Sequence, residues 1–233
     1  MLVRAVEASA FGTNCWVLAS GPGEECVVVD PGFGVVPRLR DVLTDERLRP
    51  AAVLVTHGHA DHVWSVTPVC GDAGSPVAVH VHPDDRYRLT DPLATLEPQL
   101  RHMLAAQFGP EDRWQVPERV VDLPGAAEPV TVSVAGLDLT VHHTPGHTEG
   151  STVFATGGTE PLLLSGDLLF AGSIGRTDLP GGDQAAMTRS LRDVLPRFGD
   201  DVTVLPGHGP TTTMAAERAG NPFLRALAAG RAL

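Results

Sequence analysis

The sequence predicts an α/β (α+β) protein with two β-rich halves, whose sheets pack face to face and carry helices on the outside. Three observations support this fold class. Short runs rich in valine and leucine recur along the chain and end at glycine, proline or aspartate. Longer segments between them have the apolar spacing of amphipathic helices. Strands followed by a helix occur in both halves, although no repeat is visible in the sequence itself.

The first half begins with two strands separated by the turn Ser20-Gly21-Pro22-Gly23. Apolar residues at Val35, Leu39 and Val42 then recur at helical spacing. We predict the elements of this half, in chain order, at residues 13–19 (strand), 26–30 (strand), 35–48 (helix), 51–55 (strand), 62–70 (short helix) and 76–81 (strand).

The second half contains more strands, the first two separated by Ala135-Gly136. Met187, Leu191 and Leu195 share one face of its main predicted helix. We predict the elements of this half at residues 130–134, 137–143, 151–156 and 162–165 (strands), 183–198 (helix), 202–205 (strand), and 213–219 and 222–230 (a short C-terminal helical tail).

The segment between the halves, at about 83–119, mixes aromatic, charged and proline residues and has only local helical periodicity. We interpret it as an inserted helical lid within one domain that spans residues 1–233. Long insertions of this kind often cover active sites. A plain connecting excursion with no role in the reaction is the alternative.

The bulk composition excludes several classes of protein. Hydrophobic residues make up 42% of the chain and charged residues 19%, which is ordinary for a folded globular protein and argues against extensive disorder. The net charge of −11 repels phosphate backbones, so we expect no nucleic-acid partner.

The cysteines and the N-terminus indicate a cytoplasmic protein. Cys15, Cys26 and Cys70 form no CxxC pair, so we expect free thiols in a reducing compartment. The first residues lack the pattern of a secretory signal, and no apolar run reaches the ~20 residues of a membrane span. We therefore expect no membrane association.

Three histidines and one carboxylate follow the predicted strand at 51–55: His57, His59, Asp61 and His62. Imidazole suits zinc, iron, nickel and copper, so this mixed set predicts a transition-metal site. A regular strand would direct His62 away from the other three side chains. A loop that curls after the strand could instead divide the four groups between two neighbouring metal ions.

Three further metal-competent residues follow other predicted strands. His147, Asp167 and His208 each lie directly after a glycine, which permits an abrupt turn of the backbone at a strand end. One such residue alone is ordinary turn chemistry. Four strand ends that all finish in possible metal ligands are difficult to explain by coincidence.

Together these residues resemble the ligand set of the metallo-β-lactamase-fold superfamily, and Asp30-Pro31-Gly32 resembles its first motif. Within that superfamily the chain is similar to short, glyoxalase II-like (hydroxyacylglutathione hydrolase-like) hydrolases. The segments that carry this closer resemblance are Gly172–Gly182 and Gly207–Thr213.

The resemblance implies a four-layer αββα sandwich with two divalent metal ions at one edge of the paired sheets. It gives His57, His59 and His147 to the first ion, gives Asp61, His62 and His208 to the second, and makes Asp167 the bridging ligand. Asp61 is also the candidate catalytic residue. We expect zinc, with iron or manganese as alternatives.

Two outer residues receive roles from the same resemblance. Asp30 resembles a residue that braces the histidine loop by hydrogen bonds, with ordinary turn stabilisation as the alternative. Arg176 is the one substrate-binding candidate, and the alternative is a structural ion pair with Asp178 or Asp183. Few cations follow Thr213, so we do not expect the basic C-terminal domain with which full-length relatives hold glutathione.

The expected reaction is hydrolysis of a small thioester, such as an S-2-hydroxyacylglutathione or a related acyl-thiol. A bound metal lowers the pKa of water to about 7 and supplies hydroxide without a protein base. The main alternative is a persulfide dioxygenase with one iron, which the segment Gly175–Asp178 also resembles. Ester, lactone and lactam hydrolysis are less favoured, and a metal site that serves stability alone would usually contain cysteine.

Overall fold

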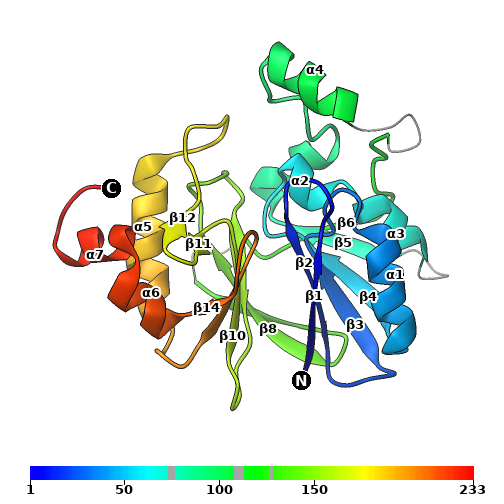
Figure 1. Cartoon of the computed structure of the whole chain (residues 1–233), viewed down its shortest axis with the longest axis horizontal. Coiled ribbons are helices and arrows are strands. Elements are labelled where there is room, and N and C mark those ends of the chain that lie inside the picture. Colours follow the sequence, from blue (N-terminus) through cyan, green and yellow to red (C-terminus); the bar gives the residue numbers. More distant parts are fainter. Residues whose placement is uncertain (73–76, 108–112, 126–127) are drawn as a thin grey trace.

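The computed structural model describes residues 1–72, 77–107, 113–125 and 128–233 and has four layers in the order helix, sheet, sheet, helix (Figure 1). The predicted mixed fold and its αββα arrangement are confirmed. Each layer follows from the pattern of the sequence, because strands with two apolar faces must be covered on both sides.

The first sheet is built from the N-terminal part of the chain. Its strands lie in the order β1 (Leu2–Glu7), β2 (Asn14–Ala19), β3 (Glu25–Val29), β4 (Arg49–Leu54), β5 (Ala78–Val81) and β6 (Val120–Asp122). Strands β3 to β6 run parallel. The residues that follow β3 and β4, among them Asp30 and His57, therefore emerge at the same edge of the sheet.

The second sheet is built from the C-terminal part. Its strands lie in the order β14 (Thr212–Thr213), β13 (Thr203–Pro206), β10 (Leu162–Gly166), β9 (Thr152–Ala155), β8 (Leu137–His143) and β7 (Val130–Val134). Strands β10 and β13 are parallel, so Asp167 and His208, which follow them, also emerge together. An isolated bridge between Thr13 and His208 connects the two sheets at this edge.

The alternation of side chains along each strand divides the core into three parts. In β3, Val27 and Val29 face the other sheet, whereas Val28 packs with the helices outside. In β10, Leu164 faces the first sheet and Leu163 packs with the helices on the other side. The near-continuous apolar runs of the sequence follow from this burial on both faces.

Helices cover both outer faces, as Figure 1 shows. The first sheet carries α1 (Val36–Asp45) and α3 (Val66–Asp72), and the second carries α5 (Gln184–Val194), α6 (Met214–Gly220) and α7 (Pro222–Ala228). Shorter elements lie between these: α2 (Ala60–Val63), η1 (Pro83–Leu89), α4 (Pro98–Gln107), η2 (Leu195–Arg197) and the hairpin of β11 (Leu169–Phe170) with β12 (Ser173–Ile174).

The structure differs from the sequence expectations mainly at short elements. Strands β6, β11 and β12 have two or three residues, too few for a periodic pattern to register. Strand β1 also lay outside the predicted elements. Helix α1 ends at Asp45, because Arg47 has a φ of 56°, and β4 includes Pro50, where its register with β3 shifts.

The segment predicted as a lid contains η1 and α4 among its described residues, and residues 108–112 lie outside them. Figure 1 places α4 above the edge at which the strand ends meet. Its role as a cover stays a prediction. None of the helices in the described ranges is long and apolar enough to cross a membrane.

Candidate metal centre

The structure brings all seven predicted ligands together at the shared edge of the two sheets. His57, His59 and His147 form one group whose ligand atoms lie within 4.8 Å of one another. Asp61, His62 and His208 form a second such group, and Asp167 joins His57 and His62 in a third.

Local backbone geometry explains how one short motif supplies both groups. Strand β4 ends at Leu54, and His59 is in an extended conformation at the N-cap of α2. Asp61 and His62 therefore lie on the first turn of a helix, whereas His57 and His59 precede it. The change from extended to helical backbone places His57 and His59 in one ligand group and Asp61 and His62 in the other. This is the division expected for a loop that curls after the strand.

Asp167 lies between the two groups. Its Oδ2 atom is 3.4 Å from His147 Nε2 and 3.7 Å from His208 Nε2, and its Oδ1 atom is 3.4 Å from His62 Nε2. One carboxylate thus reaches histidines of both groups. This is the position that a bridging ligand requires.

Hydrogen bonds orient three of the rings. His147 Nδ1 lies 2.7 Å from the carbonyl oxygen of Arg176, and His62 Nδ1 lies 3.0 Å from Asp30 Oδ2. His57 Nδ1 lies 3.1 Å from the hydroxyl of Thr56. When Nδ1 carries the proton, Nε2 of each ring is left as an acceptor that faces the cluster.

Ligand atoms of the cluster that have no hydrogen-bond partner among the described residues are suited to binding divalent cations. His57 Nε2 and Asp167 Oδ1 are buried and have no hydrogen-bond partner in the described part of the chain. Buried polar atoms normally have partners, so two unpaired acceptors in one cluster indicate a bound group. Nε2 of His62 lies 3.2 Å from Nε2 of His208, a separation that would let both nitrogens coordinate one tetrahedral cation. The donor set is compatible with a dinuclear site.

In the metal-free cluster, the pKa values of different histidines are shifted in opposite directions. Burial, together with neighbouring imidazoles, lowers the pKa values of His57 and His59 well below the ordinary value. Burial acts in the same direction on His62, but Asp167, Asp61 and Asp30 outweigh it and raise that pKa to about 10. The pKa of Asp61 lies well below its usual range, because its histidine neighbours outweigh the effect of burial.

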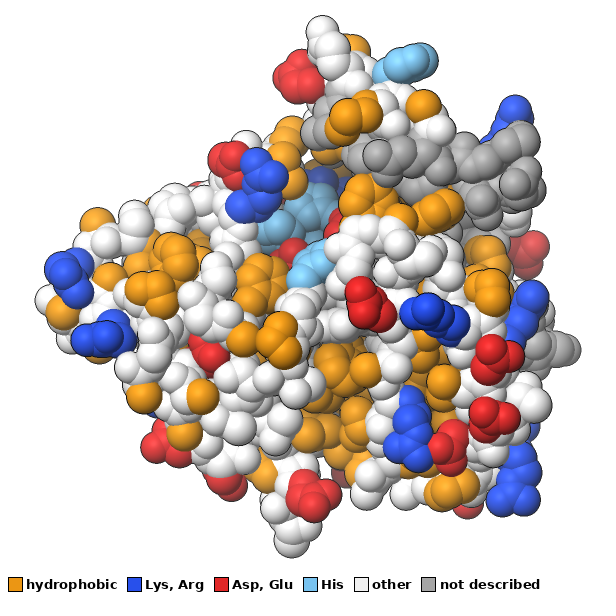
Figure 2. Space-filling view, viewed as in Figure 1, with side chains coloured by type: hydrophobic (Ala, Val, Ile, Leu, Met, Phe, Trp, Pro, Cys, Tyr) orange, Lys and Arg blue, Asp and Glu red, His pale blue; other side chains and the backbone are white. Residues whose placement is uncertain are grey.

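A cavity of about 310 Å³ opens above the cluster. Figure 2 shows histidine side chains gathered in a hollow with apolar side chains around it. The residues that line it are Phe11, His59, Ala60, Asp61, Pro92, Leu96, His147, Asp167, Arg176, Leu179 and His208. Pro92 and Leu96 come from the segment predicted as a lid.

The two outer candidates also lie near the cluster. Asp30 accepts hydrogen bonds from the backbone N–H of Thr56, at 2.7 Å, and from its hydroxyl, at 2.6 Å. Arg176 borders the cavity and forms a two-bond ion pair with Asp178, with both N–O distances at 2.7 Å. The structure thus pairs Arg176 with Asp178, whereas Asp183 caps α5.

Several residues at the site carried no signal in the sequence. The side chain of Asn14 donates to the carbonyl oxygens of Pro206 and Gly209, on either side of His208. Phe11 and Leu179 are apolar residues in loops with no periodic pattern, yet they line the cavity. These roles arise from contacts between distant parts of the chain.

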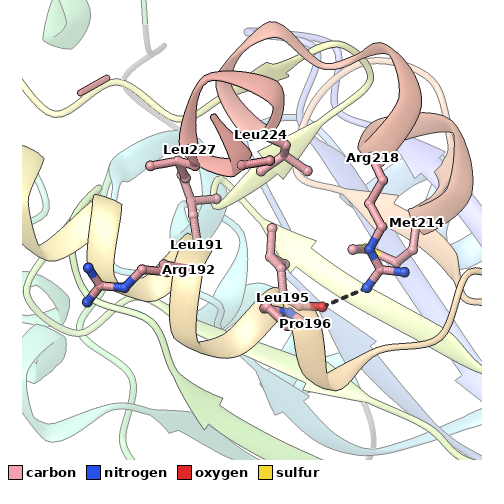
Figure 3. Close-up of a pocket in the computed structure, with 9 residues that line it drawn as sticks. Leu191, Arg192, Leu195, Pro196, Met214, Arg218, Leu224 and Leu227 are labelled. Atoms are coloured by element: carbon pink, nitrogen blue, oxygen red, sulfur yellow. Dashed lines mark hydrogen bonds between the residues drawn. The ribbon is translucent and has the colours of Figure 1, made fainter. Parts of the chain in front are cut away.

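A separate cavity of about 200 Å³ lies between α5, η2, α6 and α7 (Figure 3). Apolar side chains and two arginines line it, and Arg218 donates to the carbonyl oxygen of Leu195 at its edge. The described residues that line it include no histidine or carboxylate, so we place the chemistry at the histidine cluster.

Solved structures share the whole architecture. The B3 metallo-β-lactamase BLEG-1 is 31% identical with a TM-score of 0.77, covering 96% of this chain and 99% of that one. TTHA1623 in a di-iron-bound form is 32% identical with a TM-score of 0.76, covering 95% and 100%. ETHE1 from Myxococcus xanthus, at 23% identity and a TM-score of 0.73, covers 96% and 84% and shares the fold.

Sequence relatives match over nearly their full length. The protein Rv2581c of Mycobacterium tuberculosis is 44% identical, covering 97% of this chain and 99% of its own. The hydroxyacylglutathione hydrolase GloC of Haemophilus influenzae is 30% identical, covering 96% and 98%. The family model described as the metallo-beta-lactamase superfamily matches residues 8–208. With the seven-residue cluster at its expected edge, the chain belongs to the metallo-β-lactamase superfamily.

Proposed function

We propose that this protein is a metal-dependent hydrolase that cleaves a small thioester. The observation that carries the proposal is the pair of ligand groups joined by Asp167 at the base of a cavity. The names of two relatives support it: a hydroxyacylglutathione hydrolase in Haemophilus influenzae and a probable metallo-hydrolase in Bacillus subtilis.

His57, His59 and His147 would hold one ion and Asp61, His62 and His208 the other, with Asp167 shared between them. Zinc is the expected metal, and the di-iron form of one structural relative keeps iron as an alternative. When bound, such ions acidify water and polarise a carbonyl group. The remaining tasks are positioning the substrate and limiting the access of bulk water.

The cavity walls are suited to those tasks. Phe11, Pro92 and Leu96 offer an apolar surface to an acyl chain, and Arg176 offers the cavity a cation. Asp61 faces the cavity and remains ionised at neutral pH, since its pKa is lowered. It would therefore orient a water molecule by accepting a hydrogen bond, and it is too weak a base to remove the proton itself.

The experiment is metal analysis of protein purified without oxygen, followed by parallel assays of thioester hydrolysis and of persulfide-dependent oxygen uptake. We expect two ions per chain and hydrolysis. Asp167→Ala should lose bound metal and turnover together, because it removes the ligand shared by both groups. One iron per chain with oxygen consumption would contradict the proposal.

A further inference from the structure

Asp85 is a fully buried carboxylate in η1, outside the set of predicted ligands. Its Oδ2 atom accepts hydrogen bonds from the backbone N–H of Gly58 and from the hydroxyl of Thr148, both at 2.7 Å. Its Oδ1 atom accepts from the backbone N–H of Gly150 at 3.0 Å. Burying a charge is costly unless the charge is paired and hydrogen-bonded. Moving any of these donors away from Asp85 would therefore be unfavourable.

The donors to Asp85 lie on the two loops that carry the first ligand group. Gly58 stands between His57 and His59, and Thr148 directly follows His147. One carboxylate therefore connects both loops through short hydrogen bonds. The second group has a different support, since Asp30 binds Nδ1 of His62.

Arg88 completes this arrangement and is itself only 1% exposed. Its Nε atom lies 3.3 Å from Asp85 Oδ1, and its Nη2 atom donates to Glu149 at 2.8 Å and to the carbonyl oxygen of Pro180 at 2.9 Å. Pro180 adjoins Leu179, a wall of the cavity. The guanidinium thus balances the buried carboxylate and connects it to a third loop.

Packing leaves these loops little room to move relative to the pair. A Cβ atom on Gly58 would lie 2.7 Å from Cβ of Arg88. A Cβ atom on Gly150 would lie 2.6 Å from the backbone nitrogen of Asp85. Both loops approach η1 so closely that only glycine fits at these two points.

We propose that Asp85, supported by Arg88, is a positioning residue that sets the spacing of His57, His59 and His147. It thereby sets the affinity of the first of the two metal ions. This inference rests on the metal centre of the proposed function and not on the identity of the substrate. Outer residues that orient metal ligands commonly change metal affinity by roughly 10- to 100-fold when they are replaced.

The test compares Asp85→Asn with Asp84→Asn in the full chain. The amide that replaces the Asp85 carboxylate cannot accept from all the donors that the carboxylate serves. We expect Asp85→Asn to bind one of its two zinc ions at least about tenfold more weakly and to keep the other. Its Co(II)-substituted form should lose part of the visible absorption. Asp84, whose side chain is 58% exposed, loses the same charge when replaced and should leave both ions in place.

Enzyme kinetics and a milder variant distinguish an effect of Asp85 on the position of the metal ligands from a general loss of folding stability. At subsaturating zinc we expect kcat of Asp85→Asn to fall with KM little changed, and excess zinc to restore it in part. Thr148→Val removes one hydrogen bond to the carboxylate, together with the contact of the same hydroxyl with Ser151, and should weaken binding of the same ion to a smaller extent. It serves as the test if Asp85→Asn does not fold.

Two zinc ions bound at wild-type affinity in Asp85→Asn, or in Thr148→Val if the first variant does not fold, would overturn this inference alone. A wild-type chain that binds no metal would overturn it together with the proposed function. Metal binding without thioester hydrolysis would overturn only the choice of substrate.

Discussion

At the scale of single residues, the buried imidazole of His57 and the partly buried imidazole of His59 make the stability of the metal-free protein depend on pH. Burial lowers the pKa values of His57 and His59 below 6.5, so both rings stay neutral in the fold. Below about pH 6.5 the unfolded chain binds protons there that the folded chain does not, and the free energy of unfolding falls. We expect a loss of about 1 kcal/mol for each imidazole between about pH 6.5 and 5.5, measured by urea unfolding after chelation.

His62 does not contribute in that pH window. Its pKa is raised to about 10, so its stabilising effect is complete below pH 6.5 and is lost only as the pH rises toward 10. His59→Gln should reduce the loss on acidification. His102→Gln, at an exposed position on α4, should leave it unchanged. A metal-free protein equally stable at both ends of the acidic window would contradict this explanation.

Arg176 offers a test of substrate charge. It borders the cavity, but its side chain is 61% exposed and already paired with Asp178. Exposed charges contribute about 1 kcal/mol at most, so Arg176→Ala should raise KM for an anionic thioester by about fivefold, with kcat nearly constant. Steady-state kinetics with an anionic and a neutral thioester would measure this.

Arg192 is a matched control. Its side chain is 62% exposed and pairs with the adjacent Asp193, but it lines the other cavity. Arg192→Ala should leave KM unchanged. Equal KM values for both variants and the wild type would show that Arg176 does not bind the substrate and only forms its ion pair with Asp178.

At the scale of elements, Glu217 holds α6 against the loops near the cluster. It is 4% exposed and accepts hydrogen bonds from the backbone N–H of Gly172 at 2.8 Å and the hydroxyl of Thr212 at 2.7 Å. Asn221 donates to it at 2.8 Å. The turn between β11 and β12 and the strand after His208 are thus attached to one helix.

Removing this carboxylate takes the acceptor from the N–H of Gly172 and the hydroxyl of Thr212, while Asn221 keeps its hydrogen bond to the carbonyl oxygen of Ser173. We expect Glu217→Ala to lower the free energy of unfolding by about 2–4 kcal/mol, since an unsatisfied buried polar group costs roughly 1–3 kcal/mol. Urea denaturation measures the change. Glu160→Ala, at an exposed glutamate, should stay within about 0.5 kcal/mol of the wild type. Similar values for both variants would show that the contacts of Glu217 contribute little.

At the scale of the whole molecule, the ligands join the two sheets. His57 and His62 follow strand β4 of the first sheet, whereas Asp167 and His208 follow strands of the second. Ions bound between them would connect the two halves only in the folded state. Metal binding should therefore stabilise the fold.

We expect chelation to lower the Tm by roughly 10 °C, because a ligand at about a thousand times its Kd stabilises by about 4 kcal/mol. Differential scanning calorimetry with and without chelator measures this shift. The Tm of Asp167→Ala should respond much less, since that variant lacks the shared ligand. An equal response in both proteins would contradict the explanation.

The sequence by itself determined the fold class and the residues that the structure gathers at one edge. Strand ends are visible as apolar runs that stop at glycine or proline, and Asp167 and His208 each follow such a stop, while His57 comes directly after the run at 51–55. These local patterns marked the residues as possible metal ligands, and the resemblance to the metallo-β-lactamase-fold superfamily supplied their grouping into one site. The structure shows that β3 and β4, and likewise β10 and β13, run parallel, which brings the residues that follow them to the same edge.

Only the tertiary structure decided what surrounds the cluster. Asp85 lies in an irregular segment, and its partners on the loops of Gly58 and Gly150 are far away in the chain. The cavity walls at Phe11 and Leu179 come from loops without periodicity. Such contacts depend on how distant loops approach one another in space, and no spacing within a single segment encodes that approach.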